Sequence, residues 1–365
     1  MIKIIFVITG LDMGGAERQV CDLADKLISN GYQVKIAYLV KPMRIRPRSN
    51  KVELVWLGGD KSITSMFKAF INLVKMIKKE KADVIHSHMF HANILLRLTR
   101  LFVYSELIVC TAHSNNEGGT FRMLLYRMTD FLCDHFTNVS QSAVKDFEKA
   151  AASPKGKMIA VYNGINTEHF QFNEISRVAI RHRYSLENKK VFIAIGRLHE
   201  VKDYPNLLDA FCEVVKENSN SHLLIVGDGE LRGYLEEYIL HKGLERYVTL
   251  LGVRTDIPDL LSAADVFVLS SYWEGFGLVV AEAMSCGRVV IATNSGGVSE
   301  VIGQEGILIS PKNSGELALA MRKSIRLSEQ QVNSIGSAAR KRVLDKYSLD
   351  SAMSNWLKIY NKAQF

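Results

Sequence analysis

The chain has few cysteines, and their spacing does not suit cross-linking or zinc binding. Five cysteines occur among 365 residues, an odd number, and no two of them form a C-x-x-C pair. These features argue against a disulfide framework and against a structural zinc site. The cysteines are therefore expected to be reduced residues that pack in the interior.

Long hydrophobic runs are also absent. No window approaches the roughly 18 consecutive apolar residues that a membrane-spanning helix needs. The apolar start, residues 2–8, is short and leads directly into an amphipathic helical pattern, unlike a cleavable signal. With 47% apolar residues, the chain is expected to be a soluble, cytoplasmic protein that is long enough for two α/β domains.

Nucleic acid is not an expected partner, because the sequence has no nucleic-acid-binding module and no basic stripe interleaved with aromatic residues. Positive charge is nevertheless concentrated in one half. Residues 1–175 hold 23 lysines and arginines against 16 acidic residues, whereas residues 176–365 hold 23 against 22. Basic clusters at residues 41–48 and 75–81 have apolar neighbours and suit an anionic membrane surface or a phosphate-bearing acceptor. A merely solvated basic face is the alternative.

Short apolar runs alternate with helical patterns along the chain, without low-complexity tracts or a short repeat. Such alternation predicts parallel sheets. The predicted strands cover residues 2–9, 33–40, 52–57, 83–87, 106–112 and 135–139, and then 190–195, 222–227, 247–251, 265–270, 288–293 and 307–310. Helices are predicted at residues 16–30, 67–79, 204–218, 231–242, 316–327 and 349–362. A polar, charged segment at 165–185 separates two doubly wound α/β halves.

The most informative stretch joins a buried strand to a buried helix through a glycine turn. It runs from Glu274 through Gly275-Phe276-Gly277-Leu278 to Glu282. The glycines let the backbone approach a ligand, and the N–H groups at the helix start suit a diphosphate. Glu274 is placed to accept hydrogen bonds from sugar hydroxyls, and Glu282 to reach a ribose diol. The stretch predicts a sugar-nucleotide site, with a plain buried turn as the alternative.

The seven-residue spacing between Glu274 and Glu282 resembles the E-x7-E motif of retaining glycosyltransferases of family 4. The resemblance covers essentially the full chain. It implies the α/β GT-B fold, in which two doubly wound Rossmann-like domains face each other across a cleft. It further implies an acceptor-binding domain at residues 1–168, a nucleotide-sugar-binding domain at 169–348, and a C-terminal helix at 349–365 that crosses back to the first domain.

Two further motifs are similar to phosphate-binding elements of that family. Gly14-Gly15 opens a helix after the first strand, so that backbone N–H groups there are expected to face the donor diphosphate; a structural turn is the alternative. Arg197 and Lys202 follow the strand at 190–195 and resemble the family's basic pair, which stabilises the departing nucleoside diphosphate. The family commonly has glycine after this lysine. This chain has Asp203, which leaves the backbone shape of the loop open.

Weaker motifs complete the predicted donor pocket. Gly227 belongs to a Gly-Asp-Gly turn at the end of a strand and is expected to form a wall of the pocket. Val253 and Arg254 lie in a segment that resembles the one whose backbone reads the base in the family. Asn166 replaces the acid of the family's N-G-[IV]-D pattern, so no chemistry is assigned there.

The histidines of the first half allow two interpretations. His86, His88 and His91 have a spacing that suits zinc, but no cysteine or carboxylate lies close in sequence and the family requires no metal, so none is predicted. His113 resembles the family's histidine that faces the transferred sugar and the acceptor. His88, near a strand end, and Asn115, in the polar loop that follows, are assigned to the acceptor side. Satisfied histidines at the rim are the alternative.

The resemblance implies a retaining transferase that moves a hexose or acetamidohexose from a UDP- or GDP-linked sugar to an acceptor hydroxyl. Its catalytic residues are expected to be His113, Arg197, Lys202 and Glu274. No cofactor is expected. In the family's proposed front-face mechanism the leaving diphosphate itself accepts the acceptor proton, so no dedicated base is needed. This mechanism agrees with a chain that has cations and glycine loops and no clear catalytic dyad.

The basic first half and the Trp-Glu-Gly-Phe-Gly sequence suggest a polyprenyl-diphosphate-linked saccharide as the acceptor. The setting would be bacterial O-antigen, capsule or exopolysaccharide assembly, at the inner face of the plasma membrane. Two rival classes remain. A sugar-nucleotide epimerase of similar fold would release product without an acceptor, and a non-catalytic nucleotide-sugar-binding module would bind the donor without turnover. A phosphorylase would need a pyridoxal-phosphate lysine, which no segment recommends.

Overall fold

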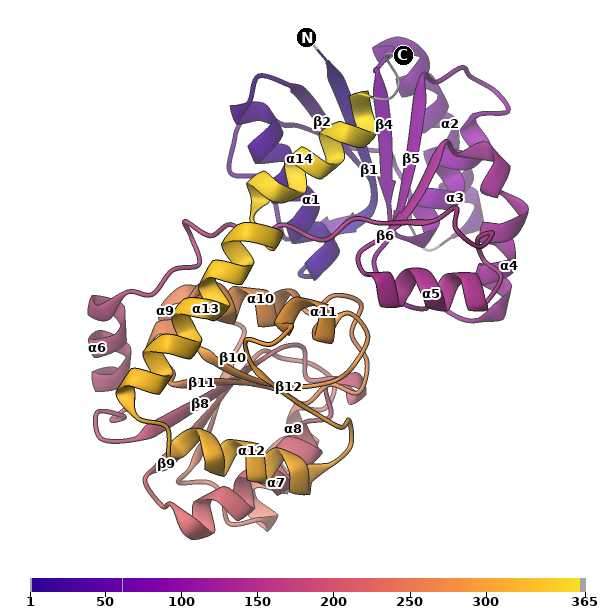
Figure 1. Cartoon of the computed structure of the whole chain (residues 1–365). Helices are drawn as coiled ribbons and strands as arrows, with labels where there is room; N and C mark the ends of the chain where they lie inside the picture. The colour runs from indigo at the N-terminus through magenta and orange to yellow at the C-terminus, as the bar shows by residue number, and fades with distance from the viewer. Residues whose placement is uncertain (1, 61, 362–365) are drawn as a thin grey trace. The chain divides into compact units, whose positions relative to one another are not determined.

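The computed structural model describes residues 2–60 and 62–361. The chain divides into two compact units, one containing the chain up to Gly164 together with the segment from Leu349 onward, the other containing Ile165–Ser348. Each unit is a parallel β-sheet with helices on both faces (Figure 1). This architecture confirms the α/β fold predicted from the alternation of apolar runs and helical patterns.

The first unit contains a seven-stranded sheet in the order β3-β2-β1-β4-β5-β6-β7. Neighbouring strands pair in parallel throughout. The strands are β1 (Lys3–Leu11), β2 (Gln33–Met43), β3 (Glu53–Trp56), β4 (Val84–His88), β5 (Leu107–Ala112), β6 (His135–Asn138) and β7 (Ile159–Ala160). The two-residue β7 was not predicted, because so short a strand has no apolar run to reveal it.

Two hydrophobic clusters hold the helices of the first unit against opposite faces of its sheet. One cluster joins the sheet to α1 (Gly15–Ser29) and α14 (Leu349–Tyr360). The other joins it to α2 (Ile63–Glu80), α3 (Phe90–Thr99), α4 (Thr120–Met128) and α5 (Gln141–Lys149). The last helix, α14, thus lies beside the first one although the whole second unit separates them in sequence (Figure 1).

The second unit contains a six-stranded parallel sheet in the order β10-β9-β8-β11-β12-β13. Its strands are β8 (Lys190–Ile195), β9 (Ser221–Val226), β10 (Val248–Gly252), β11 (Val266–Leu269), β12 (Val289–Thr293) and β13 (Ile307–Ile309). Its helices are α6 (Glu174–Arg183), α7 (Tyr204–Glu217), α8 (Arg232–His241), α9 (Ile257–Ala263), α10 (Leu278–Ser285), α11 (Val298–Ile302), α12 (Ser314–Ile325) and α13 (Glu329–Tyr347).

The strands appear in the sequence as continuous apolar runs because their side chains are buried on both faces of the sheet. All five residues from Ile4 to Ile8 are fully buried, as are Phe267 and Val268 of β11. A strand at the centre of a parallel sheet has helices on both faces, so its two sets of side chains are both apolar. All twelve predicted strands and the six predicted helices are present, with ends that differ by a few residues. Residue 362, the predicted end of the last helix, lies outside the described residues.

Strand order also determines where loops can form a site. In the first sheet the chain reverses direction across the sheet between β1 and β4, and in the second between β8 and β11. Loops that leave the carboxyl ends of two such strands run to opposite sides, which opens a crevice there. The glycine and charged motifs predicted from the sequence follow these strands.

Among the described residues, no helix is long and apolar enough to cross a lipid bilayer.

Candidate active site

In the second unit, four predicted donor motifs lie at one edge of the sheet. Arg197 follows β8, Gly227 follows β9, Val253 follows β10 and Glu274 follows β11. These four strands are direct neighbours and run in parallel, so their carboxyl ends meet at the same edge. Residues up to 77 positions apart in sequence are thereby gathered beside the reversal point between β8 and β11.

An ion pair joins two predicted site residues at this edge. Nζ of Lys202 lies 2.6 Å from Oε1 of Glu274, and both side chains are largely shielded, with exposures of 22% and 14%. Ser271 donates a hydrogen bond from Oγ to the same carboxylate oxygen at 2.7 Å. Ser270 donates from Oγ to the carbonyl oxygen of Lys202 at 2.7 Å. The lysine loop and the Glu274 loop are therefore joined directly.

The side chain of Arg197 differs from that of Lys202 in its exposure and pairing. Its side chain is exposed, and within the described parts of the chain no hydrogen bond or ion pair holds its guanidinium. A planar guanidinium with all its donors open to solvent suits two hydrogen bonds to phosphate oxygens. This edge of the sheet therefore has one open cation, Arg197, and one cation, Lys202, that is already paired.

Asp203, where the family commonly has glycine, adopts a left-handed backbone conformation with φ +50°. It ends the short 3-10 turn Glu200–Lys202 and begins α7. Glycine reaches this conformation without strain, and aspartate is among the few other residues that tolerate it. Aspartate therefore adopts at this position a conformation that glycine would reach without strain.

Two glycines are required by the geometry of this edge. Gly277 has φ +86° and immediately precedes α10. Gly227 has φ +135°, and a Cβ atom at this position would overlap the carbonyl oxygen of Gly196. The turns after β8 and β9 consequently pack backbone to backbone, which a larger residue at 227 would prevent.

The remaining predicted donor residues lie on the same loops or on α10. Glu282 is buried, at 4% exposure, on α10, and Phe276 is buried against the ring of Tyr347 with a centroid distance of 5.6 Å. Arg254 is held by Asp256 through two hydrogen bonds of 2.8 and 2.6 Å. Val253 is exposed. With the Arg254 side chain occupied, the backbone of this segment is what remains to contact a ligand.

In the first unit, the glycine pair stands at the start of α1, directly after β1. Gly14 is the N-cap residue, and no side chain caps the helix. The carboxylate of Glu17 folds back over Gly14, where a Cβ atom would overlap it. Burial raises the pKa of Glu17. The N–H groups of the first turn therefore face a carboxyl group that is less readily ionised than usual, and an incoming anion must share the turn with it.

His88 and His113 contact each other at the ends of neighbouring strands β4 and β5. Nδ1 of His88 lies 3.0 Å from Nε2 of His113. Burial lowers the pKa of His113 to about 4 and that of His88 well below its usual range. Both imidazoles are therefore neutral at pH 7.

His86 uses both ring nitrogens in hydrogen bonds within the first unit. Nδ1 bonds to the hydroxyl of Tyr360 on α14 at 2.7 Å, and Nε2 bonds to the hydroxyl of Thr111 at 2.6 Å. His86 consequently has no nitrogen left for a metal and instead ties α14 to the sheet. Across residues 2–60 and 62–361, no group of three or more His, Cys, Asp or Glu side chains is arranged to hold a metal ion.

Asn115 is turned toward α5. Its Nδ2 donates to Asp146 at 2.5 Å and to Ser142 at 3.3 Å, and the residue is only 5% exposed. Glu117, which the sequence did not single out, anchors the same loop: its carboxylate accepts from the backbone N–H of His113 at 3.0 Å and from the hydroxyl of Tyr126. Burial raises the pKa of Glu117. The loop after β5 is thus fixed at its base.

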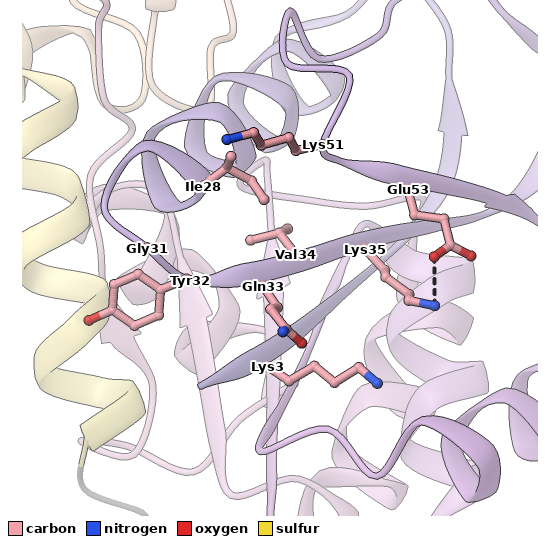
Figure 2. Close-up of a pocket in the computed structure, with 9 residues that line it drawn as sticks. All are labelled: Lys3, Ile28, Gly31, Tyr32, Gln33, Val34, Lys35, Lys51 and Glu53. Atoms are coloured by element: carbon pink, nitrogen blue, oxygen red, sulfur yellow. Dashed lines mark ion pairs between the residues drawn. The ribbon is translucent and has the colours of Figure 1, made fainter. Parts of the chain in front are cut away.

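A separate cavity of about 390 Å³ lies at the amino ends of β1, β2 and β3 (Figure 2). It contains none of the predicted site residues. Its lining includes Lys3, Lys35 and Lys51, but Lys35 pairs with Glu53 at 2.7 Å and with Glu80 at 2.9 Å, and Lys3 also pairs with Glu80. Since two of its three lysines are already neutralised, the cavity offers little charge to an anionic ligand.

Comparison with known proteins identifies the families that the two units resemble. A family model described as "Glycosyltransferase Family 4" matches residues 13–169, and one described as "Glycosyl transferases group 1" matches residues 177–342. An uncharacterized glycosyltransferase of Methanocaldococcus jannaschii is 29% identical over 384 residues, covering 96% of this chain and 95% of that protein. The Escherichia coli UDP-Gal:alpha-D-GlcNAc-diphosphoundecaprenol alpha-1,3-galactosyltransferase is 29% identical over 308 residues, covering 79% and 77%.

Among solved structures, Anabaena HepE in complex with UDP superimposes with a TM-score of 0.86 at 20% identity, covering 99% of this chain and 100% of that one. Two Rossmann-like units of this kind define the GT-B fold, and the protein is a glycosyltransferase. The chain contains a domain of glycosyltransferase family 4 at residues 13–169 and a domain of the glycosyl transferases group 1 at residues 177–342. The resemblance drawn from the E-x7-E spacing is confirmed at the level of fold, family and enzyme class.

Proposed function

We propose that the protein is a retaining glycosyltransferase that moves a hexose or acetamidohexose from a UDP- or GDP-linked sugar to a saccharide acceptor hydroxyl. The observation that carries this proposal is the joined pair Lys202 and Glu274 beside the open guanidinium of Arg197, at the carboxyl edge of the second sheet. The two cations suit the anionic phosphates of a sugar diphosphate, and the carboxylate suits the hydroxyl groups of its sugar ring.

Each donor residue has a role in this proposal. Arg197 and Lys202 bind the diphosphate and stabilise it as it departs. Glu274 accepts hydrogen bonds from the transferred sugar, and Glu282 from the ribose. The backbone of Gly275-Phe276-Gly277-Leu278, at the start of α10, contacts the phosphates, and Gly227, Val253 and Arg254 border the nucleoside.

The first unit supplies the acceptor side of the proposed reaction through His113 and His88, which stand at the carboxyl ends of β5 and β4. Gly14-Gly15, after the carboxyl end of the neighbouring strand β1, is assigned to the donor diphosphate. Asn115 acts here by holding its loop against α5, since its amide is engaged by Asp146. Among the described residues, Nδ1 of His113 has no hydrogen-bond partner, which leaves it for a ligand.

The chemistry requires no cofactor. The bond between the anomeric carbon and the diphosphate oxygen breaks, the acceptor oxygen attacks from the same face, and the acceptor proton passes to the departing diphosphate. The protein contributes positioning and charge stabilisation. The neutral state of His88 and His113 supports this assignment, because neither is needed as a charged acid.

The acceptor is proposed to be a polyprenyl-diphosphate-linked saccharide, in bacterial surface polysaccharide assembly at the inner face of the plasma membrane. The E. coli relative is named for a diphosphoundecaprenol-linked substrate. The cations at residues 44, 46, 48 and 51 are all exposed on the first unit. Exposed cations attract anionic lipid headgroups, which would keep the enzyme near such a substrate.

Two measurements test the proposal. Nucleotide sugars are screened for thermal stabilisation of the protein, and those that stabilise it are incubated with a lipid-diphosphate-linked saccharide and analysed by mass spectrometry. A product heavier by one sugar, whose anomeric configuration by NMR equals that of the donor, is expected. A converted nucleotide sugar in the absence of acceptor would indicate an epimerase, and stabilisation without transfer to any acceptor would indicate a binding module.

A further inference from the structure

The contact between His88 and His113 determines which nitrogen of each ring carries a proton. His88 is the last residue of β4 and is 1% exposed, and His113 follows the end of β5. Their hydrogen bond joins Nδ1 of His88 to Nε2 of His113. A neutral imidazole has one N–H and one bare nitrogen, so either ring is able to act as the donor.

The surroundings of His88 distinguish these two arrangements. Its second nitrogen, Nε2, is buried and has no hydrogen-bond partner among the described residues. The ring lies 4.0 Å from that of His86 and 5.5 Å from that of Phe6, centroid to centroid. If His113 were the donor, the proton of His88 would sit on Nε2, as a buried and unpaired N–H. Such orphaned donors are rarer in proteins than under-used acceptors.

We propose that His88 is a positioning residue: it donates from Nδ1 to Nε2 of His113 and thereby holds His113 in the tautomer that carries its proton on Nδ1. No hydrogen bond within residues 2–60 and 62–361 occupies Nδ1 of His113. His113 consequently presents an N–H donor to its ligand. The atom that it recognises is an oxygen that accepts a hydrogen bond, in a sugar hydroxyl or a phosphate.

This inference rests on the proposed function for its ligand, but not for its tautomer. It separates His113 from a general base: with Nε2 engaged by His88 and Nδ1 protonated, neither nitrogen is available to accept a proton from the acceptor hydroxyl. Transfer of that proton to the departing diphosphate, as proposed above, is the step that remains.

NMR of the full-length protein with 15N-labelled histidine reads the tautomer directly, since protonated and bare ring nitrogens have different shifts. The free enzyme at pH 7 is expected to show His113 with a protonated Nδ1 and a bare Nε2, assigned with a His113→Gln variant. A protonated Nε2 on His113 overturns the proposal, whatever the enzyme transfers.

Two substitutions at position 88 test the cause. His88→Leu keeps the volume and removes the donor, so His113 is expected to lose its single tautomer and kcat/KM to fall roughly threefold to tenfold, the value of one hydrogen bond. His88→Asn places an amide N–H near the former Nδ1 and is expected to restore both the tautomer and most of the rate. His91→Asn, at an exposed position on α3, is the matched control.

An unchanged His113 tautomer in His88→Leu overturns the positioning role. If His88→Leu does not fold, the tautomer of His113 in the wild type and in His88→Asn still tests the positioning role of His88. Absence of turnover with every nucleotide sugar would count against the proposed function, while the NMR result would stand, because it is recorded without substrate.

Discussion

Lys202 and Glu274, 72 residues apart in sequence, form an ion pair of 2.6 Å at the carboxyl edge of the second sheet. The pair sets a condition for ligand binding. A diphosphate that approaches Lys202 competes with Glu274 for the same ammonium group, whereas Arg197 is open to it at once. Binding is therefore expected to begin at Arg197, with Lys202 turning from the carboxylate to the phosphate.

Replacing Arg197 or Lys202 by alanine is expected to weaken nucleoside-diphosphate binding and to slow transfer. Each variant loses a charge-assisted hydrogen bond of about 1.5–3 kcal/mol, which corresponds to roughly tenfold to over a hundredfold in affinity. The loss should be larger for Arg197→Ala, since Lys202 must first leave Glu274. Calorimetric titration with UDP and GDP measures the loss of affinity. Lys216→Ala, on the exposed side of α7, is the control variant. Wild-type affinity and rate in both variants would remove the pair from the site.

The stability of the first unit should depend on pH through its buried histidines. Burial lowers the pKa of His113 to about 4, and those of His86 and His88 fall well below their usual range. The unfolded chain takes up protons below about pH 6.5 while the folded chain does not, so stability is lost as the pH falls from about 6.5 toward 4. His113 alone accounts for roughly 3 kcal/mol over this window.

Urea unfolding at pH 7 and pH 5 measures this dependence. The midpoint is expected to fall at the lower pH, and the decrease should be smaller in His113→Gln, which cannot be protonated. The exposed His241 on α8 provides the control substitution, His241→Gln, which should behave as wild type. An equal midpoint at both pH values would mean that the folded chain takes up protons over this range as readily as the unfolded chain.

Vesicle binding tests the basic surface of the first unit. Neutralising Arg44, Arg46 and Arg48 should release the protein from anionic vesicles, because each cation near such a surface contributes about 1 kcal/mol, screened over a Debye length of about 8 Å at physiological salt. Arg44 should contribute least, since its guanidinium lies 3.4 Å from Asp12. Co-sedimentation at two salt concentrations is the measurement. If the wild type shows no salt-sensitive binding, the basic half is only a solvated face.

The fold was predictable because its signals are local. Parallel strands are buried on both faces, so runs such as Ile4–Ile8 are visible in the sequence without knowledge of their partners. The glycine turn before α10 was visible for the same reason, because the positive φ of Gly277 is a property of one residue.

Contacts that join distant segments could not be predicted. Nothing in the linear sequence pairs Lys202 with Glu274, links Ser270 to the Lys202 carbonyl, or places Glu117 beneath His113. These contacts depend on strand order in the sheet and on the exact course of each loop. The spacing of His86, His88 and His91 suits a single metal site, but His86 and His88 have different partners in the structure. His88 pairs with His113, which follows the neighbouring strand β5.

Substitutions of the two glutamates of the E-x7-E motif are expected to have different effects. Glu274→Gln keeps the size and one acceptor oxygen but loses the charge that would help to stabilise an oxocarbenium-like transition state. Turnover should therefore fall by well over tenfold, which is more than about 1.4 kcal/mol. Affinity for the free nucleoside diphosphate should not fall, because the substitution releases Lys202 from its ion pair.

Glu282→Ala should fail in a different way. Glu282 is assigned to the ribose, which is present in substrate and product alike, so diphosphate affinity should fall together with the rate. Its burial at 4% exposure on α10 makes Glu282→Gln the necessary companion, since the amide preserves packing if the alanine variant is unstable. Initial rates and calorimetric titration of Glu274→Gln, Glu282→Ala and Glu282→Gln test which part of the donor each carboxylate contacts. Normal turnover in Glu274→Gln, or wild-type diphosphate affinity in both Glu282 variants, would show that these carboxylates do not contact the donor as proposed.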